Sequence, residues 1–168
     1  REAKAYYVAG THEKANLRFE AMKDQKNKKK QLYVNVDALK EMQHVIAFAN
    51  ELGVKLVIAG GSDAWMMAEE LAQKKIPVIL GSTHALPATE DDDIDQPFKT
   101  PAALYAAGIP FVLAGEAAWQ QRNLPFQAGQ AIGFGLPYEA AVQALTLSPA
   151  AIMGVGNTTG SLETGKDA

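Results

Sequence analysis

Four continuously apolar segments recur along the chain, and helix-compatible segments lie between them. We interpret the apolar segments as strands, at residues 32–36, 55–59, 76–80 and 109–113. Because their residues are apolar throughout rather than alternately, both faces of each strand are expected to be buried. Helical segments between successive strands provide the crossover that parallel pairing needs. The pattern therefore predicts an α/β fold with four parallel strands and flanking helices.

The helices are marked by capping residues, prolines and glycines. Asp37 is expected to cap a helix whose apolar positions follow 3.6-residue spacing as far as Gly53. Ser62 is expected to cap the helix after the second strand, and Thr100-Pro101 to begin the helix before the fourth. Three further helical pieces are predicted after the fourth strand, at 124–134, at 138–145 and from Ser148 onward.

Two segments depart from this rhythm. Residues 81–99 follow the third strand, contain few core-forming residues and include the acidic stretch 89–95. A long loop at the carboxyl end of a strand is typical of a lid over a site. Residues 1–22 are compatible with a helix, and the basic run 23–30 that follows has no interleaved aromatic residues. We interpret that run as a solvated helix end or loop.

Composition narrows the range of functions. The 168 residues suffice for one domain, and 48% of them are hydrophobic, as in an ordinary globular protein. A net charge of -3 gives no global positive field, so no nucleic-acid partner is expected. No window approaches 18 consecutive apolar residues, so no membrane partner is expected either. The chain has no cysteine, which excludes disulfides and thiolate zinc sites.

Candidate chemistry is sought at the carboxyl ends of the strands, where parallel α/β proteins build their sites. Glu116 follows the fourth strand, and a carboxylate there can bind a metal or act as a base. Arg122, with Asn123 beside it, can hold an anionic group of a substrate. His84 is the histidine that follows a predicted strand. The alternatives are a solvated glutamate, a helix-capping arginine and a structural histidine.

Several motifs resemble the C-terminal part of the amidohydrolase superfamily, with its imidazolonepropionase-like branch the most similar. The most specific is Gly-Ser-Leu-Glu-Thr-Gly-Lys-Asp-Ala at 160–168. The others are found at residues 55–65, 76–81, 122–126, 128–129, 135–136, 144–149 and 152–154. The likeness covers most of residues 17–168, and Ser148 stands where the family usually has asparagine.

The resemblance implies the C-terminal half of a TIM-like (β/α)8 metal-dependent hydrolase barrel. Residues 1–30 would form a helical N-terminal segment, residues 31–155 the half-barrel of β/α units, and residues 156–168 the start of a return to a small β domain. Half a barrel leaves a strand edge and an apolar face open. We therefore expect the N-terminal half of the barrel, or a second copy of the chain, to cover it.

The resemblance also implies a metal site, and here the chain departs from the family pattern. The family's metal-binding side chains would fall at Asn35, at Gly60 or Gly61, and at Glu116. Zinc, the metal expected of an active relative, prefers nitrogen, sulfur or carboxylate donors. Asparagine is a weak neutral ligand and glycine has no side chain. We expect no metal to be held by Asn35 or Gly60 themselves.

Three functions follow from these observations. The first is hydrolysis of carbon–nitrogen bonds, amide or cyclic amide, by metal-activated water, with Glu116 transferring the proton. His84, Arg122 and Asn123 would then contact a small-molecule substrate. The second is a catalytically degenerate homologue that keeps the barrel for binding or assembly, and the present 168 residues alone are expected to be inactive. The third, a flavodoxin-like or nucleotide-binding module, fits the strand–helix rhythm but not the motif at 160–168.

Overall fold

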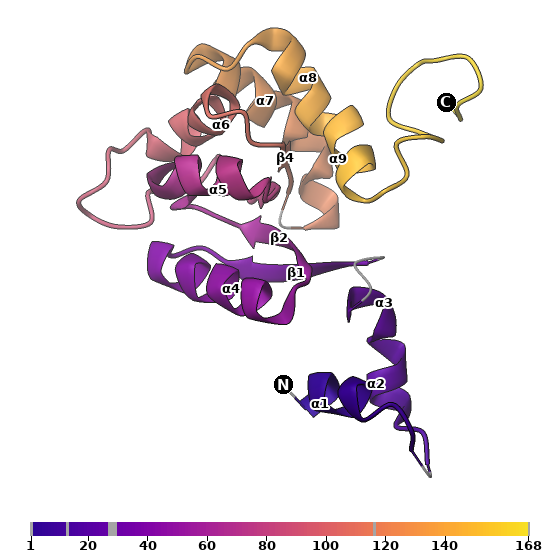
Figure 1. Ribbon diagram of the computed structural model, residues 1–168. Helices are drawn as coiled ribbons and strands as arrows, with labels where there is room; N and C mark the ends of the chain where they lie inside the picture. The colour runs from indigo at the N-terminus through magenta and orange to yellow at the C-terminus, as the bar shows by residue number, and fades with distance from the viewer. Residues whose placement is uncertain (1, 13, 27–29, 116, 168) are drawn as a thin grey trace.

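A sheet of four parallel strands forms the centre of the computed structural model, which describes residues 2–12, 14–26, 30–115 and 117–167 (Figure 1). The strands lie side by side in chain order, β1-β2-β3-β4. They span β1 Gln31–Val36, β2 Lys55–Gly60, β3 Val78–Leu80 and β4 Phe111–Leu113. Doubly wound sheets reverse their strand order at a switch point, whereas barrels keep it. The order therefore confirms the α/β prediction and argues against a flavodoxin-like module.

Helices connect the strands and continue beyond the last one. Among the described residues, none of the helices has the length and hydrophobicity to cross a membrane. The helices beyond the N-terminal segment are α4 Leu39–Leu52, η1 Ala64–Met67, α5 Ala68–Lys74, α6 Gln96–Ala106, η2 Ala118–Asn123, α7 Leu124–Gly133, α8 Tyr138–Leu145 and α9 Leu147–Ile152, where η denotes a 3-10 helix.

Prolines explain where three elements begin. The third and fourth strands begin at Val78 and Phe111, each directly after a proline that has no N–H to donate. The carbonyls of both prolines still accept sheet hydrogen bonds, from Ile58 N and Val78 N respectively. Helix α6 begins at Gln96 rather than at Thr100, so that prediction was wrong. Proline in a first helical turn loses no hydrogen bond, and here Pro97 is that residue.

The helix caps differ from the prediction. Asp37 and Ser62 do not cap helices, because they bond to each other: Ser62 Oγ donates to Asp37 Oδ1 at 2.9 Å. The first free N–H of α4, at Leu39, instead donates to Asp63 Oδ2 at 2.9 Å. This cap comes from 24 residues further along the chain, where no local pattern could reveal it.

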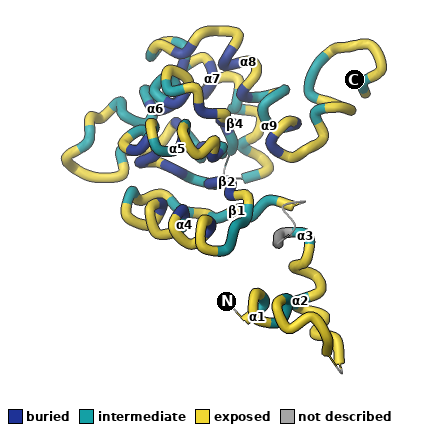
Figure 2. The backbone as a smooth tube through the Cα atoms, viewed as in Figure 1, coloured by how far each residue is buried: buried dark blue, intermediate teal, exposed yellow. Residues whose placement is uncertain are grey.

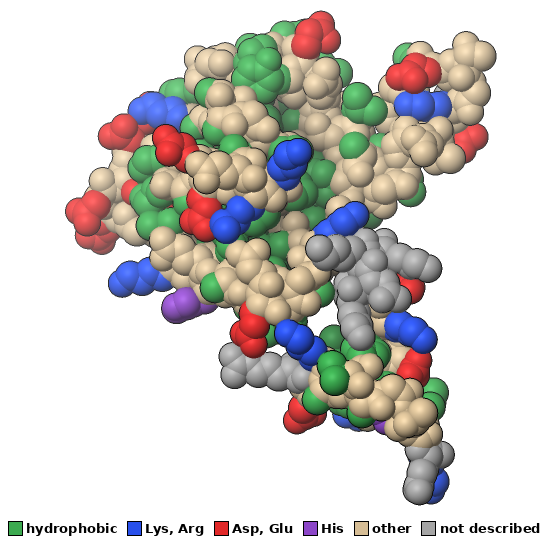
Figure 3. Space-filling model, in the orientation of Figure 1, with side chains coloured by type: hydrophobic (Ala, Val, Ile, Leu, Met, Phe, Trp, Pro, Cys, Tyr) green, Lys and Arg blue, Asp and Glu red, His purple; other side chains and the backbone are tan. Residues whose placement is uncertain are grey.

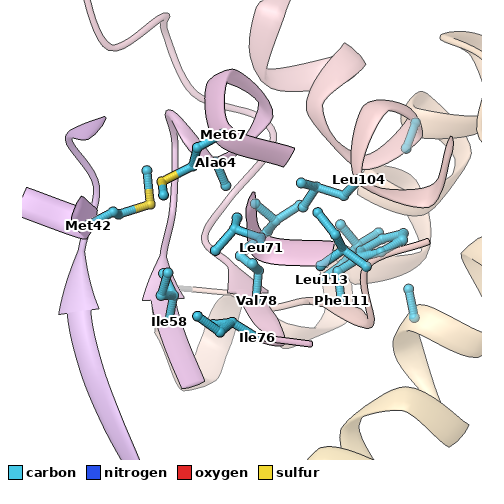
Figure 4. Close-up of a cluster of buried hydrophobic side chains, with 14 of the residues drawn as sticks. Met42, Ile58, Ala64, Met67, Leu71, Ile76, Val78, Leu104, Phe111 and Leu113 are labelled. Carbon is cyan, nitrogen blue, oxygen red and sulfur yellow. The ribbon is translucent and has the colours of Figure 1, made fainter. Parts of the chain in front are cut away.

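The main hydrophobic core lies between one face of the sheet and helices α4 to α8 (Figure 4). Met42, Ile58, Leu71, Leu104 and Leu113 are among its largest fully buried members. Burial of a side chain of this size stabilises a fold by about 1.5–3 kcal/mol. A second cluster on the opposite face joins Val57, Ile79 and Val112 to Ile152 of α9.

The N-terminal segment stands apart from the sheet, at the lower right of Figure 1, and is mostly exposed in Figure 2. It contains α1 Glu2–Ala9, α2 Leu17–Ala21 and α3 Lys23–Lys26. Asn16 caps α2 through its side-chain oxygen. The Tyr6 ring stacks on His12 with 3.6 Å between ring centroids and tilts against Phe19 at 5.2 Å. Because α1 and α2 bury no residue, their packing rests on these ring contacts and on hydrogen bonds between the helices, such as that from the Tyr6 hydroxyl to Glu20 Oε1 at 2.9 Å.

Candidate ligand site at the carboxyl ends of the strands

A small pocket opens above the carboxyl ends of β2 and β3. Its volume is about 60 Å³, which exceeds the space that one ordered water needs. Gly60, Ser62 and Gly81 form the strand-end side, and Leu86 and Pro87 come from the loop that joins β3 to α6. The pocket therefore lies at the carboxyl edge of the sheet, where parallel α/β proteins build their sites, beside the loop interpreted as a lid.

Apolar side chains, neutral polar groups and one carboxylate line this pocket. Hydroxyls come from Ser62, Ser82, Thr83 and Thr100, and the carboxylate comes from Asp92. Asp92 Oδ2 also accepts a hydrogen bond from Thr89 N at 3.1 Å, which closes a turn within the loop. Because the one charged residue among the described lining residues is a carboxylate, the pocket suits a neutral or cationic ligand better than an anion.

The loop is acidic on its outer side, and Figure 3 shows acidic side chains at the left edge of the molecule. Lys99 of α6 contacts two of them, with its Nζ 2.7 Å from Asp95 Oδ1 and 3.0 Å from Asp93 Oδ2. The hydrogen bonds to Asp95 and then to Asp93 raise the pKa of Lys99 above its ordinary value. Lys99 thus ties the loop to α6.

Asp37 and Ser62 form a hydrogen-bonded pair beside the pocket. Asp37 follows β1, and its Oδ1 accepts from Ser62 Oγ at 2.9 Å and from Ser62 N at 3.3 Å. Both residues are exposed. The pair crosses from the end of one strand to the end of the next, so it joins the two neighbouring strand ends.

Asp63 is a buried carboxylate with one free oxygen. The residue is 9% exposed, and its Oδ2 caps α4 at Leu39 N. Its Oδ1 has no hydrogen-bond partner among the described residues, and neither has the buried Nε1 of Trp65. An unpartnered buried polar atom lowers the stability of the fold. The hydrogen bond from Leu39 N to Asp63 Oδ2 therefore has to offset the free-energy cost of the unpartnered Oδ1.

Gln127 of α7 holds the start of the loop after β3. It is only 3% exposed, and its Oε1 accepts hydrogen bonds from Thr83 N at 3.0 Å and Thr83 Oγ1 at 3.4 Å. Because Thr83 lines the pocket, Gln127 is a positioning residue for that wall.

The structure does not bring the predicted substrate contacts together. His84 is exposed, contacts Phe98 edge-on at 6.3 Å between centroids, and does not line the pocket. Arg122 and Asn123 lie in η2, after β4, and no described interaction joins either residue to His84. Glu116 lies outside the described residues. The roles predicted for these four residues therefore stay predictions.

The positions where the family's metal ligands would fall do not form a metal site here. Asn35 of β1 pairs with Ala59 and is exposed on the sheet face opposite α4. Gly60 and Gly61 have positive φ angles and offer no side chain. Among the described residues, no group of three or more histidine, aspartate or glutamate side chains could hold a metal ion. The donors present do not fit zinc.

Sequence reasoning missed the Asp37–Ser62 pair, the Asp63 cap and the Gln127 anchor. A signal for the first was present, because Asp37 directly follows one predicted strand and Ser62 comes shortly after the next, and the two strands are neighbours in a parallel sheet. Carboxyl ends of neighbouring parallel strands meet at one edge, where such residues can bond to each other. Gln127 carried no such signal, since it lies 44 residues from Thr83.

No family model and no curated protein matches the chain. Solved structures do. An amidohydrolase from Thermotoga maritima MSB8 is 26% identical, with a TM-score of 0.84 over 99% of this chain and 46% of that one. A second amidohydrolase is 16% identical, with a TM-score of 0.59 over 86% of this chain and 38% of its own. An adenosine deaminase from Xanthomonas campestris with bound zinc is 17% identical, with a TM-score of 0.56 over 90% of this chain and 38% of its own.

These likenesses have two consequences. The two proteins below 25% identity show the shared fold, that of TIM-barrel hydrolases, of which this chain matches only a part. The Thermotoga protein adds sequence identity over nearly the whole chain and supports the amidohydrolase superfamily, with this chain as a C-terminal part. The chain spans less than half the length of each of these structures.

Proposed function

We propose that this chain is part of an amidohydrolase-type hydrolase of carbon–nitrogen bonds, amide or cyclic amide, and that it contributes the ligand-binding side of the barrel. The single observation that carries the proposal is the likeness to the Thermotoga amidohydrolase, with a TM-score of 0.84 over 99% of the chain. The pocket above β2 and β3 supports it, because barrel enzymes bind ligands at that end. The motif at 160–168 favours the imidazolonepropionase-like branch.

Within this proposal, Glu116 is the proton-transfer group, while His84, Arg122 and Asn123 contact a small-molecule substrate. Zinc would be bound mainly by residues outside this chain, since the described residues offer no group of three ligating side chains. The open sheet face and the free edge of β1 would be covered by the N-terminal half of the barrel. The 46% coverage of the Thermotoga protein supports that choice over a second copy, because the remainder of such a chain is large enough to complete a barrel.

A second candidate is a catalytically degenerate homologue that retains the barrel for binding or assembly. Three residues favour it specifically, because Asn35, Gly60 and Glu116 stand where the family has two histidines and an aspartate as metal-site residues. Glycine cannot bind a metal through a side chain, and a neutral amide is a poor substitute for imidazole.

Metal analysis and turnover separate the two candidates. The full-length protein is purified without chelator, its zinc content is measured, and hydrolysis of amide and cyclic amide substrates is followed. Hydrolysis is expected to require bound zinc and to be lost in Glu116→Gln but kept in Glu90→Gln, a matched change in the exposed loop. A folded protein without zinc and without turnover would overturn the hydrolase and leave the degenerate homologue.

A further inference from the structure

We infer that the carboxylate of Asp37, held by Ser62, occupies the space that a side chain at position 60 would need, so that the ends of β1 and β2 form an anionic edge closed to a histidine metal ligand. The inference rests on the proposed function only for the correspondence between position 60 and the family's ligand. Its tests measure zinc binding and unfolding, so they can fail separately from tests of turnover.

The backbone at Gly60 excludes a side chain in two ways. Its φ angle is +99°, a conformation that residues with a Cβ atom rarely adopt. A Cβ built there would lie 2.6 Å from Asp37 Oδ1 and 2.8 Å from the carbonyl oxygen of Val36. That carbonyl cannot move away freely, because it accepts a hydrogen bond from Gly61 N at 2.8 Å. Any side chain at position 60 therefore displaces both a carboxylate and a sheet carbonyl.

Gly61 offers no alternative position for the ligand. Its φ angle is +71°, and a Cβ there would lie 2.9 Å from Cγ1 of Val78. Val78 is fully buried in the main core, so its side chain has no free space to enter. Neither glycine can be replaced by histidine without disturbing the strand or the core.

Asp37 is fixed in the place of that side chain. Two donors from Ser62 orient its Oδ1, and its backbone oxygen accepts from Asp63 N at 3.1 Å. The pair does not itself make a metal site, because Oδ1 already accepts two hydrogen bonds and no group of three ligating side chains includes Asp37 in the described part of the chain. This edge thus presents a single carboxylate where an imidazole would stand.

Zinc binding to a restored ligand set tests the inference. The full-length protein and its Asn35→His/Gly60→His variant are dialysed against zinc chloride, and bound zinc is measured by elemental analysis. The variant is expected to bind no more zinc than the parent. One additional equivalent of zinc in the variant would overturn the inference.

A stability series covers the case in which the double variant does not fold. Gly108 has a similar positive φ of +74° but nothing within 4 Å of a built Cβ, and Gly81 has neither restriction. Gly60→Ala is expected to lower the urea midpoint more than Gly108→Ala, and Gly81→Ala is expected to lower it least. When Asp37→Ala is added to both variants, the difference in urea midpoint between Gly60→Ala and Gly108→Ala should become smaller. Equal midpoints for Gly60→Ala and Gly108→Ala would overturn the inference.

Discussion

The carboxylates of Asp37, after β1, and Asp63, after β2, have different structural roles. Asp37 bonds to Ser62 at the surface, whereas Asp63 is buried and caps α4. Adjacent residues at the end of β2 therefore have different roles, because Ser62 bonds to Asp37 at the surface and Asp63 anchors α4. Removing either side chain should therefore affect different properties of the protein.

Replacing Asp63 with alanine leaves the Leu39 N–H without its acceptor. Loss of an N-terminal cap costs about 1 kcal/mol of unfolding free energy, measurable by urea denaturation of the full-length protein. Asp63→Asn keeps an acceptor oxygen and should lower the unfolding free energy by less than Asp63→Ala does. Asp91→Ala removes an equal charge from the exposed loop and should leave the unfolding free energy nearly unchanged. If Asp63→Ala is no less stable than Asp91→Ala, the carboxylate does not act as a cap.

Lys99 should titrate above its ordinary pKa of 10.5, because its charged form donates hydrogen bonds to Asp95 and Asp93. A raised pKa means that its contribution to stability is fully present below pH 10.5 and is lost as the pH rises through the folded value. NMR titration of the Lys99 side chain checks this. Asp95→Asn should lower the Lys99 pKa, and Asp91→Asn should leave it unchanged. A Lys99 pKa that does not respond to Asp95→Asn would refute the ion pair between Lys99 and Asp95 at the start of α6.

At the scale of elements, α7 positions the wall of the pocket through Gln127. Gln127→Leu keeps the side-chain volume but removes the acceptor of the Thr83 N–H. Leaving that buried donor unsatisfied costs about 1–3 kcal/mol of unfolding free energy. Hydrogen exchange at the Thr83 amide should become faster as well. Gln130→Leu, three residues along the same helix, is the control, and equal effects of the two substitutions would contradict the anchoring role.

The four strands and the helices between them were predictable from the sequence to within a few residues, whereas η2 was not predicted, and the reason is visible in particular elements. Apolar runs such as 55–59 bury both faces, and the spacing of α4 follows its buried stripe of Met42, Ile46 and Ala49. The true start of α6 was missed because Pro97 permits an earlier turn than Thr100-Pro101. Caps were missed because Asp63 reaches α4 across the sheet edge, and such contacts depend on register.

The sequence indicated the carboxyl edge of the sheet but not the residues that line the pocket there. Strand ends identified the edge, yet the pocket joins Gly60, Ser82 and Asp92, which only the sheet register and the loop path bring together. The sequence showed that glycine replaces a metal ligand at position 60 or 61. Why a side chain does not fit at Gly60, which has a positive φ angle and lies close to Asp37 and Val36, could be seen only in the three-dimensional structure.

At the scale of the whole molecule, the sheet has β1 at one edge and β4 at the other, and its face opposite α4 is only partly covered. Tyr33 on that face is 46% exposed, whereas Val57 and Val112 lie under α9. If the N-terminal half completes the barrel, the β1 amides that point away from β2 should exchange hydrogen as slowly in the full-length protein as those of β2. Rapid exchange along β1 in the full-length protein would contradict coverage of this edge.

Anomalous diffraction at the zinc edge, from crystals of the full-length protein grown with zinc chloride, tests the central claim most directly. The claim is that the carboxyl ends of β1 and β2 contribute to a ligand pocket and do not bind a metal ion. We expect no zinc peak within about 2.3 Å of the side-chain atoms of Asn35 or Asp37, or in the space beside Gly60. A zinc ion bonded to Asp37 or Asn35 would contradict the account.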